Sequence, residues 1–374
     1  MKLGITGAAG LLGYHLRARL HAQGNKDVRL ADRATFADAQ ALEAFVHGLD
    51  GIVHFAGMNR GGDTEVARTN VALALSLVTA LQRTGARPAL VYANSIHVDR
   101  DTAYGRSKRA AAEILEAWAQ GKNGEKGADA PFCDLRLPNV FGEFGRPFYN
   151  SVVSTFCQQI AVGETPQIQI DAIMDLMHAQ DVARRVLDAL SRGERGCVRV
   201  PGTPLSVSAL LEKLRALHGA YMAQIVPALC EPLDVQLFNT LRSYLFPKHY
   251  PVSLKLHSDP RGSLFEVIKS GNGGQVFMST TRPGVTRGNH FHTRKVERFL
   301  VAGGEADISL RKLFTNEVTT FRVRGSEPCY IDMPTFHTHN ITNTGLSELT
   351  TLFWTNEIFD PADTDTYPEM VTPA

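Results

Sequence analysis

The sequence predicts two domains of different class: a parallel β-sheet flanked by helices, followed by an all-β barrel. A chain of 374 residues exceeds what one hydrophobic core usually contains. From residue 2 to about residue 245, short β-rich apolar runs alternate with Ala- and Leu-rich helical stretches, which is typical of a parallel α/β sheet. After residues 247–251, Gly-rich turns separate short runs of alternating polarity, as in a β-sandwich or barrel. We therefore assign residues 1–246 to the first domain and 247–374 to the second.

The individual elements follow from the same patterns. In the first domain we expect strands at residues 2–6, 28–31, 51–55, 89–93 and 132–135. The helical patterns lie between or after these strands, at residues 11–23, 39–47, 65–84, 105–120 and 182–192. In the second domain we expect no helix, and strands at residues 274–281, 298–301, 305–310, 319–323 and 349–354.

Composition and charge exclude several classes of function. The 39 basic and 38 acidic residues almost cancel, so the chain has no bulk field that would attract nucleic acid or an anionic membrane. The N-terminal apolar stretch breaks at glycine too early for a signal peptide, and no apolar run approaches the roughly 20 residues that span a bilayer. The five scattered cysteines form no Cys-x-x-Cys pair and are expected to be reduced. We expect a cytoplasmic, soluble protein without nucleic-acid partners or membrane insertion.

A glycine-rich turn follows the first expected strand and opens the first expected helix. Gly7, Gly10 and Gly13 have the spacing GxxGxxG, with Leu11 and Leu12 between the last two. Glycines in this setting let the backbone approach a pyrophosphate at the positive N-terminus of a helix. An ordinary tight turn is the structural alternative. The position between strand and helix predicts a dinucleotide-binding site.

Two adjacent residues at the end of the second expected strand indicate opposite cofactors. The carboxylate of Asp32 would favour the free ribose hydroxyls of NAD, whereas the guanidinium of Arg33 would favour the NADP phosphate. Surface ion pairs would explain either residue equally well. We favour NADPH, bound through Arg33, because a biosynthetic reduction draws on the cellular pool of NADPH.

The next motif predicts a carbonyl reduction. Tyr104 and Lys108 are four residues apart on an expected helix, so their side chains project from one face, and Ser95 lies upstream. We expect the ammonium of Lys108 to lower the pKa of the Tyr104 phenol, which would donate a proton to a carbonyl oxygen while hydride arrives at carbon. Ser95 would hydrogen-bond the same oxygen. A Tyr-x-x-x-Lys pattern alone is common, but after a glycine-rich first turn it favours catalysis.

Together these motifs resemble the extended short-chain dehydrogenase/reductase family, which includes nucleotide-sugar epimerases, dehydratases and 4-keto reductases. The resemblance covers about two-thirds of the chain, with further matches at residues 54–57, Asn70, residues 136–142 and residues 178–181. It implies a Rossmann-like fold and an NAD(P)-dependent enzyme. The chain departs from the family in two ways that affect the pocket. Only about twenty residues separate the strands that match the family's second and fourth strands, so the third strand must be very short or absent. The spacing between the serine and the tyrosine is also shorter than usual.

The resemblance also implies roles for individual residues. Ser95, Tyr104 and Lys108 would be catalytic, and Asn139 would contact the substrate. The cofactor contacts would come from the glycine-rich turn and from the ends of two strands: Gly7, Gly10, Leu11, Leu12, Gly13, Asp32, Arg33, Ala56 and Gly57.

The second domain contains a candidate metal site. His290 and His292 face the same side of a strand because side chains alternate with a period of two, and Glu297 follows at the next strand. His339 could complete the site with a third nitrogen. Three neutral imidazoles and a carboxylate suit zinc, iron, manganese or nickel, and we favour zinc because no redox step is required. Ordinary surface and turn histidines are the structural alternative.

This second constellation resembles the cupins, whose two sequence motifs have this order and spacing. The first motif is matched in full. The second motif has Phe336 where a glycine is usual. It also contains an additional histidine, His337, which could lie beside the metal ligands, take part in catalysis or merely be exposed. Cupins without a metal use the same barrel, so the resemblance implies the fold more directly than the ion.

The combination of the two parts resembles the bifunctional capsular and O-antigen sugar enzymes of the CapF type over essentially the whole chain. Matching stretches lie at residues 54–60, 149–152, 155–157, 259–263, 288–290 and 354–357. In that family the cupin part epimerises C3 of a UDP-linked 4-keto-6-deoxy-N-acetylhexosamine. The reductase part then reduces C4 with NADPH and gives UDP-2-acetamido-2,6-dideoxy-β-L-talose, a precursor of UDP-N-acetyl-L-fucosamine. The resemblance also implies a homodimer.

Several alternatives remain open at this point. The metal could stabilise enolate charge as a Lewis acid or could only hold the barrel in shape. The cupin could be a structural or dimerising module of a simple 4-keto reductase. The chain could also be a nonenzymatic nucleotide-sugar sensor, although Ser95, Tyr104 and Lys108 weigh against that reading. The sequence does not identify the epimerisation base or decide between UDP and dTDP as the carrier.

Overall fold

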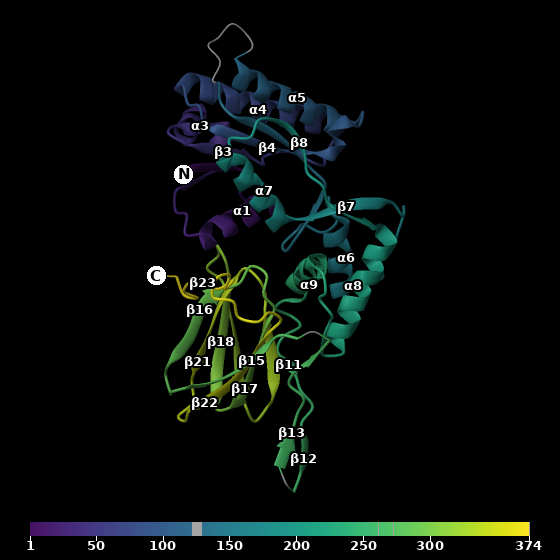
Figure 1. Ribbon diagram of the computed structural model, residues 1–374, viewed down its shortest axis with the longest axis vertical. Coiled ribbons are helices and arrows are strands. Elements are labelled where there is room, and N and C mark those ends of the chain that lie inside the picture. The colour runs from purple at the N-terminus through teal and green to yellow at the C-terminus, as the bar shows by residue number, and fades with distance from the viewer. Residues whose placement is uncertain (122–128, 261, 272, 374) are drawn as a thin grey trace. The chain divides into compact units, whose positions relative to one another are not determined.

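The computed structural model describes residues 1–374 except 122–128, 261, 272 and 374 (Figure 1). Contacts divide the chain into two compact units: the first comprises Met1–Thr155 and Ile168–Val207, and the second Phe156–Gln167 and Ser208–Ala374. All of residues 208–246 therefore group with the β-rich unit by contact. The domain boundary at residue 246 follows a change in sequence pattern and stays a prediction.

The first unit contains a six-stranded parallel sheet, which confirms the predicted fold class. Its strand order is β2-β1-β3-β4-β5-β8. The five predicted strands occur within two residues of the expected ends, and β8 was not predicted. The strands are β2 (Val28–Ala31), β1 (Leu3–Thr6), β3 (Gly51–His54), β4 (Ala89–Ser95), β5 (Phe132–Leu137) and β8 (Gly196–Arg199).

The connection from β2 to β3 explains the short interval seen in the sequence. Among the described residues it holds no strand, only the helices α2 (Arg33–Ala37) and α3 (Ala39–Val46). β2 is consequently an edge strand of this sheet, with β1 between it and β3. The expected loss of a third strand is confirmed.

Helices cover both faces of this sheet, and each layer has its own apolar core (Figure 1). On one face Leu42 and Leu77 pack beneath α3, α4 (Asp63–Thr84) and α5 (Ala103–Gln120). On the other face the core lies beneath α1 (Leu11–Ala22) and α7 (Ala179–Ser191). α5 begins where the Thr102 hydroxyl accepts a bond from the Gly105 amide, and it ends at Gly121 in the left-handed region. All five predicted helices are present.

A small three-stranded sheet lies beside the main one and was not predicted. Its order is β6 (Asn139–Phe141), β7 (Ile173–His178) and β9 (Thr203–Ser206). Its strands are short, and several of their residues are exposed, so the apolar alternation that marks a strand is weak. The sheet fixes Asn139 next to the end of β4, because β6 directly follows β5.

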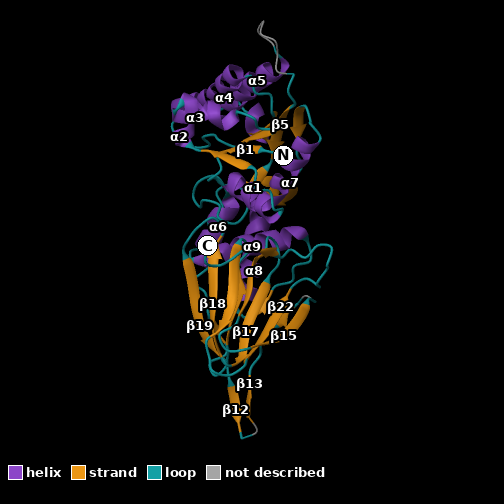
Figure 2. Cartoon of the chain, turned by 90° about the vertical axis from the view of Figure 1, so that its left-hand side faces the viewer, coloured by secondary structure: helices purple, strands orange, loops and turns teal. Residues whose placement is uncertain are grey.

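The second unit is built on two five-stranded antiparallel sheets, as the cupin prediction required (Figure 2). One has the order β11 (Val252–Ser253), β20 (Cys329–Met333), β17 (Glu297–Gly303), β22 (Leu349–Thr355) and β15 (Gln275–Thr281). The other has the order β19 (Val318–Arg324), β18 (Glu305–Lys312), β21 (His337–Asn343), β16 (Thr286–Phe291) and β23 (Tyr367–Pro368). All five strands predicted for this part are present, and the described residues after 246 contain no helix, as expected.

The helices α8 (Val207–Met222) and α9 (Pro232–Leu245) are bonded to the first of these sheets. The Tyr221 hydroxyl of α8 donates to Asp332 of β20 at 2.5 Å, and the same carboxylate accepts from Arg298 of β17 at 2.7 Å. Arg242 of α9 donates to the carbonyl of Met333 at 2.6 Å. All these side chains are buried, which explains why residues 208–245 group with the strands. No helix in the described part of the chain is long and apolar enough to cross a membrane.

Candidate functional sites

The glycine-rich turn has a backbone that side chains would obstruct. Gly7 has a φ of +65°, and a Cβ added there would lie 2.8 Å from the amide nitrogen of Ala56. A Cβ on Gly13 would lie 2.4 Å from the carbonyl oxygen of Gly7. Gly10 is the N-cap of α1, which leaves the first amides of the helix without a side-chain cap. This narrow cradle at a positive helix end fits a dinucleotide pyrophosphate.

The two segments predicted to contact the cofactor are joined by a buried threonine. The Thr6 hydroxyl lies 2.8 Å from Nδ1 of His54 and accepts a bond from the Ala56 amide at 3.0 Å. β1 and β3 are neighbours in the sheet, with Thr6 opposite His54. The glycine-rich turn and the Ala56-Gly57 turn therefore lie at the same edge, as the prediction requires.

Asp32 and Arg33 differ in what their side chains already bind. Asp32 is the N-cap of α2, and its carboxylate accepts bonds from the Thr35 amide and the Thr35 hydroxyl, both at 2.9 Å. These bonds lower the pKa of Asp32. Arg33 follows as the first residue of the helix and is exposed. Because the Asp32 carboxylate already caps a helix, it is less available to bind the ribose hydroxyls of NAD. The Arg33 guanidinium is exposed and remains available to bind the phosphate of NADP.

The structure brings the predicted catalytic residues to the end of β4. Ser95 is the last residue of this strand, and its side chain acts on the Tyr104 phenol of α5, whose pKa it lowers. Lys108 lies one turn further along the helix and is buried. Its Nζ donates to the carbonyl of Ala93 at 2.7 Å and lies 4.0 Å from the centre of the Tyr92 ring. The phenol and the amine thus lie one turn apart on α5, and both act at the end of β4.

The acidity of the phenol differs from the expectation. Burial raises the pKa of Tyr104, and the polar side chain of Ser95 opposes this only in part. Burial also lowers the pKa of Lys108 to about 7, against the attraction of Asp134. The expected lowering of the Tyr104 pKa by the Lys108 ammonium does not hold in this structure, because the amine is bonded to Ala93 and its own charge is weakened by burial.

The four candidate metal ligands of the second unit form one cluster. Their ligand atoms all lie within 4.8 Å of one another. Nε2 of His292 is 3.0 Å, and Nε2 of His339 is 3.1 Å, from the same carboxylate oxygen of Glu297. The ring of His290 lies 4.6 Å from that of His339, centre to centre. Side chains from β16, β17, β21 and the turn after β16 therefore converge, as the spacing predicted.

The ionisation of this cluster suits a divalent cation. Burial, together with His339 and His292, lowers the pKa of His290 to about 3, so this imidazole is neutral. Burial would raise the pKa of Glu297, but His292 and His339 outweigh it and hold the pKa well below its usual value. A neutral imidazole and an ionised carboxylate are donors that zinc and similar metals bind, and binding would displace the proton that Glu297 and Asp365 favour on His292 by raising its pKa. These residues therefore fit the metal that the cupin motif implies.

Two family models match the chain. The NAD dependent epimerase/dehydratase family matches residues 3–199, and the polysaccharide biosynthesis C-terminal domain matches residues 257–367. The chain belongs to the NAD-dependent epimerase/dehydratase family. It is therefore an enzyme of the NAD(P)-dependent reductase/epimerase type, followed by a region that matches a second family model.

Individual relatives match over the whole length. The UDP-2-acetamido-2,6-beta-L-arabino-hexul-4-ose reductase of Pseudomonas aeruginosa is 33% identical over 374 residues, which is 98% of each chain. The crystal structure of the capsular polysaccharide assembling protein CapF from Staphylococcus aureus is 30% identical, with a TM-score of 0.61 over 99% of this chain and 100% of that one. The UDP-N-acetylglucosamine 4-epimerase from Bacillus cereus is 20% identical over 59% of this chain and 82% of its own, with a TM-score of 0.51, and shows the fold alone. The predicted resemblance to CapF-type enzymes is confirmed.

Asn139 lies close to Ser95, and a histidine that the sequence analysis missed lies between them. The Asn139 amide donates to the carbonyl of Asp175 at 3.3 Å, and its side chain acts on the pKa of His97, which burial lowers, an effect that Asn139 opposes. The His97 amide donates to the Ser95 hydroxyl at 3.2 Å. Tyr149, which also acts on the pKa of Tyr104, was noted only as a match to the family. The one signal for His97 was its position two residues after Ser95.

The second cupin motif departs from the usual pattern without losing its turn. Phe336 is fully buried and has a φ of +60°, a conformation that usually favours glycine and explains why glycine is common there. His337 is also buried, so the exposed alternative for this residue is wrong. Its Nδ1 lies 3.0 Å from the carbonyl of Thr335, and its ring lies 4.9 Å from that of Phe246. His337 is not part of the ligand cluster.

Proposed function

We propose that this chain is a bifunctional nucleotide-sugar enzyme of capsule or O-antigen biosynthesis. The second unit would epimerise C3 of a UDP-linked 4-keto-6-deoxy-N-acetylhexosamine, and the first would reduce C4 with NADPH to UDP-2-acetamido-2,6-dideoxy-β-L-talose. The observation that carries this proposal is the presence of two complete donor sets in one chain. One is Ser95, Tyr104 and Lys108, and the other is the four-residue His/Glu cluster. The name of the 33% identical relative, a hexul-4-ose reductase, supports the substrate class.

In the first unit, the side chains would handle one oxygen and one proton. Tyr104 would donate its proton to the C4 oxygen, and the hydroxyl of Ser95, whose side chain acts on the same phenol, would hydrogen-bond that oxygen. Burial raises the pKa of Tyr104, so the phenol carries its proton at neutral pH and is ready to act as an acid. NADPH bound at the glycine-rich turn would supply the hydride. The buried Lys108 would orient the cofactor ribose beside Tyr104.

In the second unit, the side chains would support proton exchange next to a ketone. A C4 carbonyl acidifies the C3 proton, so a base can remove it and a proton can return to the other face without any change of oxidation state. A divalent ion held by His290, His292, Glu297 and His339 would supply positive charge that stabilises the developing oxyanion. Reduction at C4 then removes the carbonyl and makes the inversion at C3 permanent.

Arg33 is proposed to select NADPH. Changing Arg33 to alanine is expected to raise the Kd for NADPH by about 10- to 100-fold, because one charge-assisted bond to the 2′-phosphate is lost. The Kd for NADH should change little, since that cofactor has no 2′-phosphate. Binding is measured by fluorescence titration of each cofactor. Arg87→Ala removes an exposed guanidinium from the same unit and is the matched control. Equal weakening for both cofactors would contradict the assignment.

The function is tested with purified enzyme and a panel of UDP- and dTDP-linked 4-keto sugars. NADPH absorbance reports reduction, and NMR in deuterated water reports exchange at C3. We expect exchange without NADPH, reduction when NADPH is added, and a clear preference for the UDP-linked 4-keto-6-deoxy-N-acetylhexosamine. Reduction without any exchange would leave a simple 4-keto reductase with a structural cupin. Neither reaction with any sugar would exclude the enzyme and favour the sensor.

A further inference from the structure

The last residues of the chain run alongside the strand that carries the first metal ligand. We call residues 357–371 the C-terminal strap. Within it, β23 pairs with β16 so that Pro368 lies opposite His290. The Glu369 amide donates to the carbonyl of Asn289 at 2.9 Å, and Arg311 of β18 donates to the carbonyl of Val371 at 2.6 Å. The strap is therefore fixed to the strands of the ligand cluster rather than hanging as a free tail.

A buried carboxylate in the strap holds the turn between two of the ligands. Asp365 is 1% exposed, and its carboxylate accepts four hydrogen bonds. They come from the amide and the hydroxyl of Thr293, at 3.0 and 2.6 Å, and from the amides of Arg294 and Lys295, at 3.0 and 2.9 Å. These three residues directly follow His292 and precede Glu297. The side chain of Asp365 thus bonds each of the three residues that follow the first of these two ligands.

The backbone of the same residue contacts a ligand directly. The carbonyl oxygen of Asp365 accepts a bond from Nδ1 of His292 at 2.5 Å. This bond requires a proton on Nδ1, which leaves Nε2, 3.0 Å from the Glu297 carboxylate, as the nitrogen that would bind a metal. Asp365 has a φ of +42°, and the four bonds to its carboxylate keep the backbone in this uncommon conformation. Its side chain therefore determines where its carbonyl points.

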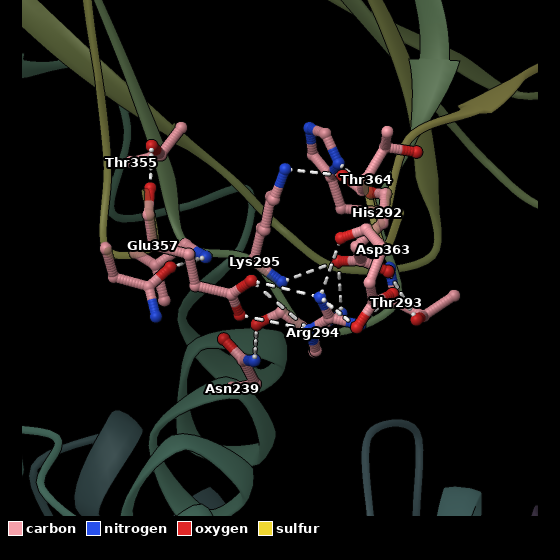
Figure 3. A network of polar contacts seen from close by, with 12 residues as sticks. Asn239, His292, Thr293, Arg294, Lys295, Thr355, Glu357, Asp363 and Thr364 are labelled. Carbon is pink, nitrogen blue, oxygen red and sulfur yellow. Dashed lines mark hydrogen bonds and ion pairs between the residues drawn. The ribbon is translucent and has the colours of Figure 1, made fainter. Parts of the chain in front are cut away.

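Further bonds join the strap to the same turn (Figure 3). Arg294 forms ion pairs with Glu357 at 3.1 Å and with Asp363 at 3.0 Å. The Nζ of Lys295 donates to the carbonyl of Thr364 at 2.5 Å. On the other side, the amide of Asn239 on α9 donates to the carbonyl of Arg294 at 2.7 Å. The turn is held from both sides, so Asp365 acts on a rigid frame.

We propose that Asp365 is a positioning residue for metal binding: through its carbonyl it fixes the tautomer and ring orientation of His292, and through its carboxylate it fixes the turn that separates His292 from Glu297. This inference rests on the proposed metal site. It extends the functional residues to the C-terminal strap, far in sequence from both cupin motifs. Removing a partner of this kind typically weakens metal affinity by about 10- to 100-fold.

The test compares Asp365→Asn with Asp360→Asn in the full-length chain. Asp360 lies in the same strap, is exposed, and bonds the Ala362 amide rather than the turn. The Kd for Zn²⁺ is measured by competition with a chromophoric chelator, and Co²⁺-loaded protein is examined by visible absorption. We expect Asp365→Asn to weaken Zn²⁺ binding at least about 10-fold and to change the Co²⁺ spectrum. Asp360→Asn should resemble the wild type in both measurements.

Circular dichroism at the assay temperature establishes that each variant is folded. If Asp365→Asn does not fold, Thr293→Val replaces it, because this change removes only the 2.6 Å hydroxyl bond, and we expect a smaller weakening in the same direction. A folded Asp365→Asn protein with wild-type affinity and spectrum would overturn the inference while leaving the metal site intact. A wild-type chain that binds neither ion would overturn the metal site itself, and the inference with it.

Discussion

Replacing Tyr104 by phenylalanine should reduce the NADPH-dependent reduction of the keto sugar by roughly 10²- to 10⁴-fold, the usual contribution of a positioned proton donor. The phenol is the group that the structure places against Ser95, and phenylalanine keeps the ring while it removes the proton. The rate is followed by NADPH absorbance under saturating cofactor and sugar. Because the change removes a transition-state interaction, the loss should appear in kcat more than in KM.

The matched control for this variant is Tyr330→Phe. Tyr330 is a buried tyrosine of the second unit whose hydroxyl has no hydrogen-bond partner within the described residues. Its removal should leave the reduction rate close to that of the wild type, so any general cost of a tyrosine-to-phenylalanine change is measured separately. Undiminished NADPH turnover in Tyr104→Phe would remove the proposed proton donor and revive the nonenzymatic sensor.

The parts of the molecule that sequence predicted well are those with local signals. Strands buried on both faces read as short apolar runs, and the alternation with helices identified the parallel sheet. The glycine-rich turn was recognisable because Gly7 must adopt a positive φ and Gly13 must lie against a carbonyl. His290 and His292 were recognisable because strand periodicity places both on one face. In each case a few neighbouring residues carried the information.

The parts that sequence missed depend on contacts between distant residues. α8 and α9 group with the β-rich unit because of buried bonds such as that from Tyr221 to Asp332, which no local pattern records. The pKa of Tyr104 rises because the fold buries the phenol, whereas spacing alone suggested that Lys108 would lower it. Asp365 contacts His292 across 73 positions of sequence, in a segment with no motif of its own. Local patterns can therefore identify candidate residues, but burial and long-range hydrogen bonds determine the chemistry of those residues.

Changing His290 to alanine should abolish metal binding and with it the exchange of the C3 proton. The imidazole is one of the four donors of the cluster, and its low pKa, about 3, keeps it neutral and available at any pH near neutrality. We expect exchange in deuterated water, followed by NMR in the absence of NADPH, to fall by at least about 100-fold. Removing a residue that only hydrogen-bonds a metal ligand lowers metal affinity or activity by up to about 100-fold. Removing a ligand itself should have a larger effect. Metal content after dialysis is measured on the same samples.

His257→Ala is the control for this substitution, because it removes an exposed histidine from β12 (His257–Asp259) of the same unit. This variant should keep both its metal and its exchange rate. The comparison also separates the two roles left open for the ion. If His290→Ala loses the metal and remains folded by circular dichroism but no longer exchanges the proton, the ion acts in the chemistry. If it unfolds on losing the metal, the ion holds the barrel. Exchange that persists in a folded, metal-free protein would show that the ion is not needed for the exchange.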